Sequence, residues 1–138
     1  MAHQDEFVVE TRGRGTQDIT ATVARIVGAS GVRCGLAHVF VLHTSASLLL
    51  TENADPDVRR DLETLARRWA PEGDPDYRHR DEGADDMAAH ARSALTGSAL
   101  SLPIRDGALR LGTWQGLYLW EHRGTPHRRR LVVTVLGD

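Results

Sequence analysis

The sequence predicts an α+β fold, with largely antiparallel strands in a sandwich-like core and about three helices. From residue 98 onward, short apolar segments typical of strands follow one another. Asp106-Gly107, between the first two of these segments, is typical of a tight hairpin. Before residue 98, three separate segments have apolar residues at helical spacing: one after residues 16–18, one after Asp55-Pro56 and one from about residue 85 to 97. With 138 residues, the chain is expected to form one domain, residues 1–138, with a sizeable core.

The first segments predict a strand, a helix and a second strand. The first strand is expected at residues 6–12, with Phe7 and Val9 on one face. Polar residues 16–18 suit a helix start, and Gly28 and Gly31 suit its end. The second strand is expected at residues 36–43, with both faces largely apolar. That pattern favours cover by a helix on one side and by a second sheet or a neighbouring subunit on the other.

The strongest helix start is Asp55-Pro56, because Asp is a favoured cap and Pro suits the first helical position. The apolar residues that follow predict one buried stripe: Val58, Leu62, Leu65 and Trp69. Residues from Pro71 to about Gly83 are expected to form a loop. A further helix is expected from about residue 85 to 97, with His90 pointing inward.

The remaining strands are expected at residues 99–104, 108–111, 115–122 and 129–136. The third of these is again apolar on both faces. Because a small monomer has too little core for several such strands, the pattern predicts an oligomer.

Composition and charge exclude several classes of partner. A net charge of −2 argues against nucleic-acid binding, which usually needs a clear basic excess. No apolar stretch approaches the length of a membrane span, and the first residues, MAHQDEF, lack the features of a signal peptide. The single cysteine, Cys34, cannot form an internal disulfide. We therefore expect a cytoplasmic protein with no nucleic-acid or membrane partner.

Four segments together resemble the YjbQ family, also called the uncharacterised UPF0047 family. They are HTSASLLLTENADPDVRRDL, YRHRDEG, AAHARSALTGSALSLPI and GALRLGTWQGLYLWEHRG, and the likeness covers nearly the whole chain. The resemblance implies a compact α+β subunit rich in antiparallel strand that assembles as a homotrimer. It also implies a secondary thiamine-phosphate synthase activity, which joins an aminopyrimidine methyl diphosphate to a thiazole phosphate and releases pyrophosphate.

Seven histidines suggest a metal site. Three of them, His43, His79 and His90, stand at positions matching histidines of the family pattern. Three neutral imidazoles suit Zn²⁺ or a similar late divalent ion and leave a position open for water or substrate; Mg²⁺ would suit a diphosphate. The spacing is not diagnostic, because the same histidines would also suit phosphate binding or hydrogen bonds within the core.

Glu52 and Glu121, together with His43, are the candidates for general acid or base chemistry. If buried on its strand, Glu121 would need a partner. Along one straight strand, His43 and Glu52 would lie about 30 Å apart, at roughly 3.3 Å per residue. Either the strand turns near residues 45–47, or the two side chains belong to different sites that meet across subunits.

Other side chains in the matching segments are expected to surround phosphate oxygens or a planar ring. They are Thr44, Ser45, Asn53, Arg92, Gly112, Thr113, Trp114 and Gln115. Two departures from the family pattern affect this set: Arg92 replaces a more usual Lys, and DEGADDMAAH lacks the Asn commonly found after Glu-Gly.

Two classes of function remain open. One is a thiamine-phosphate synthase-like transferase acting on phosphorylated small molecules, although the chain has no P-loop and no Asp-rich metal pair. The other is a trimer that binds a metal or a small anionic metabolite without turning it over. A metal-dependent hydrolase of phosphate esters would use the same residues.

Overall fold

The computed structural model describes all residues from Met1 to Asp138. Along the chain, the elements are β1 (Ala2–Glu10), β2 (Gly15–Asp18), α1 (Thr20–Ser30), β3 (Cys34–Val41), β4 (Ala46–Glu52), α2 (Pro56–Trp69), α3 (Asp86–Thr96), β5 (Ala99–Arg105), β6 (Ala108–Leu109), β7 (Gln115–Glu121) and β8 (Arg128–Gly137). The strand expected at residues 108–111 is shorter than predicted, and β1 begins earlier than residue 6.

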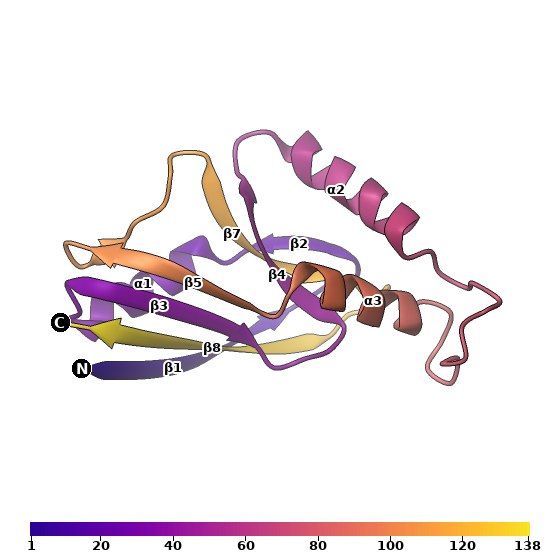
Figure 1. The fold of residues 1–138 in the computed structure, drawn as a ribbon, viewed down its shortest axis with the longest axis horizontal. Helices are drawn as coiled ribbons and strands as arrows, with labels where there is room; N and C mark the ends of the chain where they lie inside the picture. The colour runs from indigo at the N-terminus through magenta and orange to yellow at the C-terminus, as the bar shows by residue number, and fades with distance from the viewer.

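The strands form two antiparallel sheets (Figure 1). The larger has the order β1-β8-β3-β5-β6, and the smaller has the order β2-β7-β4. Apolar side chains of both sheets belong to one core, for example Val39 and Val133 from the larger sheet and Leu48 and Leu119 from the smaller. The expected α+β architecture with a sandwich-like core is therefore confirmed.

Helix α1 contributes Val23, Ile26 and Val27 to this core. It ends at Gly31, which adopts the left-handed conformation with φ of 76°, whereas Gly28 lies within the helix. The residues expected to start α1 form the short strand β2 instead, with Thr16 opposite Trp120. Four residues are too few to show a strand period, so this strand could not be recognised from the sequence.

The chain turns between β3 and β4, at residues 42–45. The single strand considered above is therefore two strands in different sheets. His43 lies in the turn before β4, and Glu52 is the last residue of β4. Because β4 has seven residues, it separates the two side chains by about 20 Å within one chain.

Helix α2 starts as predicted: the Asp55 carboxylate accepts a hydrogen bond from Asp57 N at 2.9 Å, and Pro56 is the first helical residue. The predicted burial of its apolar stripe is wrong for the single chain, since Leu65 is 38% exposed and Trp69 52% exposed. The buried residue of the helix is Ala66. In Figure 1, α2 lies along one side of the molecule, away from the larger sheet.

The larger sheet is covered on one face only. In β3, Ala37, Val39 and Val41 are buried in the core, while Leu36 and Phe40 are exposed on the other face. Within one chain, β3 is therefore covered on one face, and the expected cover of its other face by a neighbouring subunit stays a prediction. Strand β7 is covered on both faces, since its residues 116–121 are all buried. No helix of the structure combines the length and the apolar character needed to cross a membrane.

Candidate functional site

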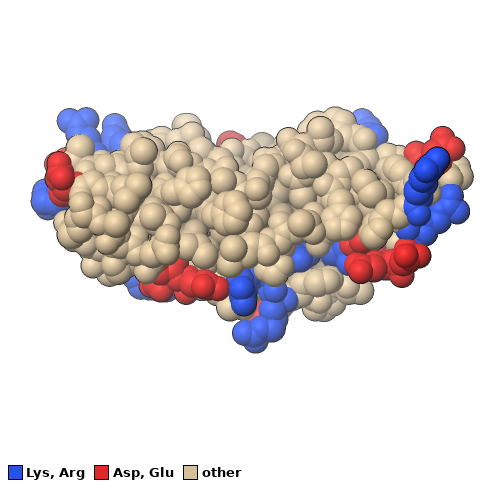
Figure 2. All heavy atoms as spheres, turned by 60° about the horizontal axis from the view of Figure 1, so that its bottom comes forward, with Lys and Arg blue, Asp and Glu red and all other residues tan.

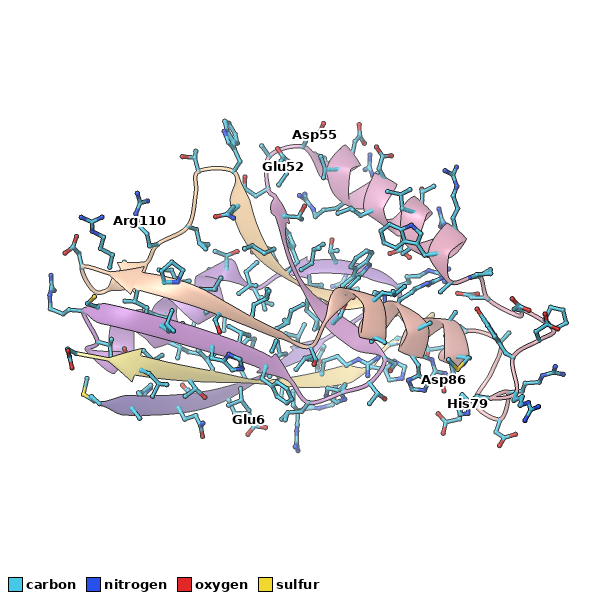
Figure 3. The ribbon with its side chains drawn as sticks, viewed as in Figure 1. Glu6, Glu52, Asp55, His79, Asp86 and Arg110 are labelled. Atoms are coloured by element: carbon cyan, nitrogen blue, oxygen red, sulfur yellow. The ribbon has the colours of Figure 1, made fainter.

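Many of the residues predicted to carry function lie in two separate places, and the others lie outside both. Figure 3 shows Glu52 and Asp55 at the turn between β4 and α2, and His79 beside Asp86 at the start of α3. The second place holds a group of potential metal ligands, His79, Asp86 and His90, which we call the histidine cluster. Its ligand atoms all lie within 4.8 Å of one another.

Local structure explains how the histidine cluster is assembled. Asp86 and His90 are four residues apart in α3 and therefore lie on the same helix face. His79 comes from the loop between α2 and α3, which is closed by a hydrogen bond from Gly73 N to Ala84 O of 3.1 Å. The Nε2 atoms of His79 and His90 lie 2.6 Å and 2.9 Å from Asp86 Oδ2.

Asp86 is the centre of the cluster. Its side chain is 1% exposed, and its second oxygen, Oδ1, pairs with Arg123 Nη1 at 2.8 Å. Burial alone would raise the pKa of Asp86, but the hydrogen bond from His79 and the charges of His90 and Arg123 outweigh burial and lower it. The carboxylate therefore stays ionised and offers Oδ2 toward both imidazoles.

Both ring nitrogens of His90 face hydrogen-bond acceptors. Its Nδ1 lies 2.9 Å from the carbonyl oxygen of Thr44, which can only accept, so Nδ1 carries a proton. Its Nε2 faces Asp86 Oδ2, which as a carboxylate also only accepts. Either a proton or a metal ion must lie between them. A ring N–H bonded to a backbone carbonyl is the usual arrangement around a metal-ligating histidine.

The distances are compatible with an ion. Two ligands at about 2.1 Å from an octahedral or tetrahedral ion lie roughly 3.0–3.4 Å apart. The observed separations of 2.6 Å and 2.9 Å would therefore widen by less than about 1 Å. Two imidazoles and one carboxylate suit zinc or another late divalent ion. The side chains of His79 and His90 are 42% and 31% exposed, so further coordination positions face solvent.

His43 does not belong to the cluster, which corrects the predicted ligand set His43, His79 and His90. Its Nε2 accepts a hydrogen bond from Arg130 N at 2.8 Å, so the proton of the neutral ring is on Nδ1 and no nitrogen is free to ligate. Burial, followed by the charges of Arg129 and Arg130, lowers the pKa of His43. Asp86 takes the place expected for His43.

Glu121, one of the predicted acid or base residues, has both carboxylate oxygens occupied by hydrogen bonds. It is buried, and its carboxylate pairs with Arg129 and accepts a hydrogen bond from Thr11 Oγ1 at 2.7 Å. Burial alone would raise the pKa of Glu121, but the hydrogen bonds from Arg129 and Thr11 outweigh burial and lower it. The partner that a buried Glu121 was expected to need is thus Arg129.

The segments containing Glu52 and Trp114 form a second group, the β4–β7 corner, made up of Glu52, Asn53, Gly112, Thr113, Trp114 and Gln115. Asn53 Nδ2 donates to the carbonyl oxygens of Thr113 and Gln115, both at 3.3 Å, and Gly112 N donates to Gln115 Oε1 at 2.8 Å. The Glu52 carboxylate accepts from Asp55 N at 2.9 Å. These bonds fix the turn and leave Trp114 64% exposed.

Two other predicted phosphate ligands lie in structural positions. Arg92 is 1% exposed, and its Nη2 donates to Ala70 O at 2.9 Å. That carbonyl lies at the C-terminal end of α2, where the helix dipole favours a cation. Ser45 Oγ accepts from Arg129 Nη2 at 3.0 Å. Thr44 lies beside the histidine cluster and supplies its carbonyl to His90.

Sequence reasoning missed Asp86 and Arg123. The spacing of Asp86 and His90 on a predicted helix could have indicated a shared ligand pair. Nothing in the sequence indicated Arg123, which follows β7 in a loop and whose Nε also pairs with Asp85 at 3.1 Å.

Comparison with known proteins gives the family. A sequence profile described as UPF0047 protein YjbQ-like matches residues 5–138. A UPF0047 protein of Synechocystis sp. is 49% identical over 136 residues, which is 99% of this chain and 92% of the relative. The UPF0047 protein YjbQ of Salmonella typhimurium is 42% identical over the whole of both chains.

Solved structures of YjbQ-like proteins have a similar fold. A YbjQ-like protein of unknown function from Sulfolobus solfataricus is 27% identical with a TM-score of 0.91, covering 100% of this chain and 99% of the other. An uncharacterised yjbq/upf0047 family protein from Clostridium acetobutylicum is 38% identical with a TM-score of 0.88, covering 96% and 99%. The chain therefore belongs to the UPF0047 YjbQ-like family.

Proposed function

We propose that this protein is a divalent-metal-dependent enzyme acting on a phosphorylated small molecule, with thiamine-phosphate synthesis as its reaction. The observation that carries this proposal is the donor set of the histidine cluster: two imidazoles and a buried carboxylate whose ligand atoms lie within 4.8 Å of one another. The exposure of His79 and His90 favours catalysis over a structural role, because structural metal sites are closed and catalytic sites keep a position open.

Each residue of the site has a distinct task. His79, Asp86 and His90 would hold the ion, which would neutralise the charge developing on a departing diphosphate. Arg123 holds Asp86 Oδ1, so that only Oδ2 points toward the histidines, and the Thr44 carbonyl fixes the orientation of the His90 ring. A pocket of about 430 Å³ adjoins His79 and includes Tyr77 and Arg80 in its lining, which gives room for a small ring.

In the proposed reaction, the bond between the pyrimidine methylene carbon and the diphosphate oxygen breaks, and the oxygen keeps the electron pair. The ring nitrogen of the thiazole phosphate forms the new bond to that carbon, and pyrophosphate leaves. The exposed Trp114 lies in the β4–β7 corner, which within one chain is remote from the histidine cluster. It would contribute a ring-stacking surface only to a site shared between copies.

We also propose that the chain assembles as a homotrimer through the outer face of the larger sheet. This face exposes Val8, Leu36, Phe40 and Leu136, and Leu42 is exposed just beyond β3. Figure 2 shows a broad surface on which charged side chains gather at the ends and along one margin. The same face also carries the exposed ion pairs Glu6–Arg130 and Glu10–Arg128. Exposed apolar side chains of this number on one sheet face favour association with further copies of the same chain.

The proposed function is tested first by metal content. Untagged protein from cells grown with zinc should contain about one divalent ion per chain by elemental analysis, and Asp86→Asn or His90→Ala should lose it. His38→Ala is the matched control, because His38 is exposed and bonds Ser101 on the outer sheet face. Metal-free wild type would contradict the metal centre.

Activity is tested with the same variants. Wild type should form thiamine phosphate from the two phosphorylated precursors, and His90→Ala should slow it about 100-fold or more. Wild type that holds metal but makes no product above a heat-killed blank would reject this reaction. Turnover of a simple phosphate ester by such protein would then favour the hydrolase, and no turnover would favour a binding protein.

A further inference from the structure

A second pocket has His90 in its lining but not Asp86. Its volume is about 250 Å³, well above the roughly 10–15 Å³ that one water needs. We call it the hydroxyl pocket and define it by its lining: His43, Thr44, His90, Ser93, Ala94 and Ser98. Three of these residues carry hydroxyl groups, and none is acidic.

Ser93 is the most informative residue of the lining. It is 9% exposed, and its Oγ is buried without any hydrogen-bond partner. A buried hydroxyl without a partner costs about 1–3 kcal/mol. The neighbouring α3 residue His90 uses its Nδ1 on Thr44 O and does not relieve this cost. A ligand that accepts a hydrogen bond would do so.

The imidazole of His43 adds a second donor. Its Nε2 is occupied by Arg130 N, so the neutral ring can present only an N–H, from Nδ1. The guanidinium charges of Arg129 and Arg130 act on this ring, and the carboxylate of Glu121 opposes them. The hydroxyls of Thr44 and Ser98 complete a lining of donors. A lining of hydroxyl and imidazole donors without a carboxylate suits an oxyanion.

We propose that the hydroxyl pocket binds a tetrahedral phosphoryl group, with Ser93 and His43 as its principal donors. The inference deepens the proposed function and rests on it for its catalytic meaning: the phosphoryl group belongs to the substrate whose chemistry takes place at the histidine cluster. The binding itself needs no metal. A phosphate monoester and free phosphate share this chemistry, and both are used as probes.

The experiment is calorimetric titration of chelator-treated, metal-free protein with inorganic phosphate and, separately, with methyl phosphate. Wild type should bind at least one of them, and the preferred probe distinguishes a free-phosphate site from an ester site. Ser93→Ala should weaken binding by about tenfold or more, the scale of a hydrogen bond to a charged group. His43→Gln should weaken it similarly.

Ser101→Ala is the matched control, since Ser101 is exposed on β5 and bonds His38; it should bind like wild type. His79→Ala should also keep phosphate binding, so failure of the metal centre and failure of this pocket are separable. The proposal is overturned if folded wild type binds neither probe, if binding appears only after zinc is added, or if Ser93→Ala and Ser101→Ala bind equally.

Discussion

His122 is a buried imidazole with an unusual ionisation. Its Nε2 contacts Ser47 Oγ at 2.8 Å, and its ring packs against Trp120 with centroids 5.0 Å apart. Burial, followed by the charge of Arg92, lowers the pKa of His122 to about 3 from 6.5. The ring therefore stays neutral in the folded protein throughout the mildly acidic range.

This shift predicts the pH dependence of stability. Below pH 6.5 the unfolded chain takes up a proton on His122 that the folded chain refuses until about pH 3. The free energy of unfolding should therefore decrease as the pH is lowered. Between pH 6.5 and pH 5, His122 should account for a decrease of about 1–2 kcal/mol. His122→Gln should flatten the profile measured by urea unfolding, and the exposed His38→Gln should not. An unchanged slope in His122→Gln would contradict the assignment.

His43 adds to the same slope, because its pKa is also lowered. The lowered pKa values of Asp86 and Glu121 act further into the acid range, where each carboxylate loses its stabilising effect as the pH falls toward its folded pKa. The window between pH 6.5 and 5 therefore reports mainly on the imidazoles.

Individual residues show what the sequence could and could not predict. His79 and His90 were recognisable as a pair, but His43 was not distinguishable from them, because its exclusion depends on a backbone N–H of Arg130, 87 positions away along the chain. Glu121 was correctly expected to need a partner if buried. The identity of that partner, Arg129, depends on how β7 and β8 are joined.

At the scale of elements, α2 is attached mainly through polar contacts. Trp120 Nε1 donates to Glu63 Oε2 at 2.8 Å, and Arg14 Nε pairs with Glu63 Oε1 at 3.0 Å. Arg59 lies over the Tyr118 ring, 4.8 Å from its centroid. The only buried residue of the helix is Ala66, so apolar burial contributes little to holding α2 in place.

Glu63→Ala should therefore loosen α2 selectively. We expect a loss of about 1–2 kcal/mol in unfolding free energy and faster amide hydrogen exchange within residues 56–69 than in β3. Asp61→Ala is the control, because Asp61 is exposed and lies roughly 200° around the helix from Glu63. Equal exchange in both variants would mean that packing, not Glu63, holds the helix.

The same helix shows the limit of periodicity as a guide. The start at Asp55-Pro56 followed from local chemistry and is confirmed. The apolar stripe predicted one water-avoiding face, but not which surface covers it, and Leu65 and Trp69 remain exposed in the single chain. Cover depends on elements distant in sequence or on another molecule, neither of which a local pattern contains.

At the scale of the whole molecule, the exposed face of the larger sheet predicts assembly. Phe40 of β3 is 40% exposed on this face. It lies opposite Val132 of the neighbouring strand β8. Phe40→Glu would place a charge inside the interface and should convert the trimer to 15.2 kDa subunits. Light scattering on a sizing column measures this mass directly.

Leu95→Glu serves as the control, since Leu95 is exposed on α3 rather than on the sheet; it should remain trimeric. Wild-type protein with the mass of one subunit at micromolar concentration would contradict the proposed trimer. The sequence pointed to an oligomer because strands apolar on both faces exceed what one small core can cover. The sequence could not show which of these strands is covered on both faces within the chain. In the structure β7 is covered in this way and β3 is not.

The hydrogen bond between Gly73 N and Ala84 O has an evolutionary consequence. It fixes both ends of the loop that carries His79, and the entropy cost of closing a loop rises only slowly with its length. Insertions and deletions inside this segment would leave α2, α3 and the pair Asp86 and His90 in place. They would shift only His79, so descendants of this chain could change the size and kind of ion that the proposed site would select without rebuilding the fold.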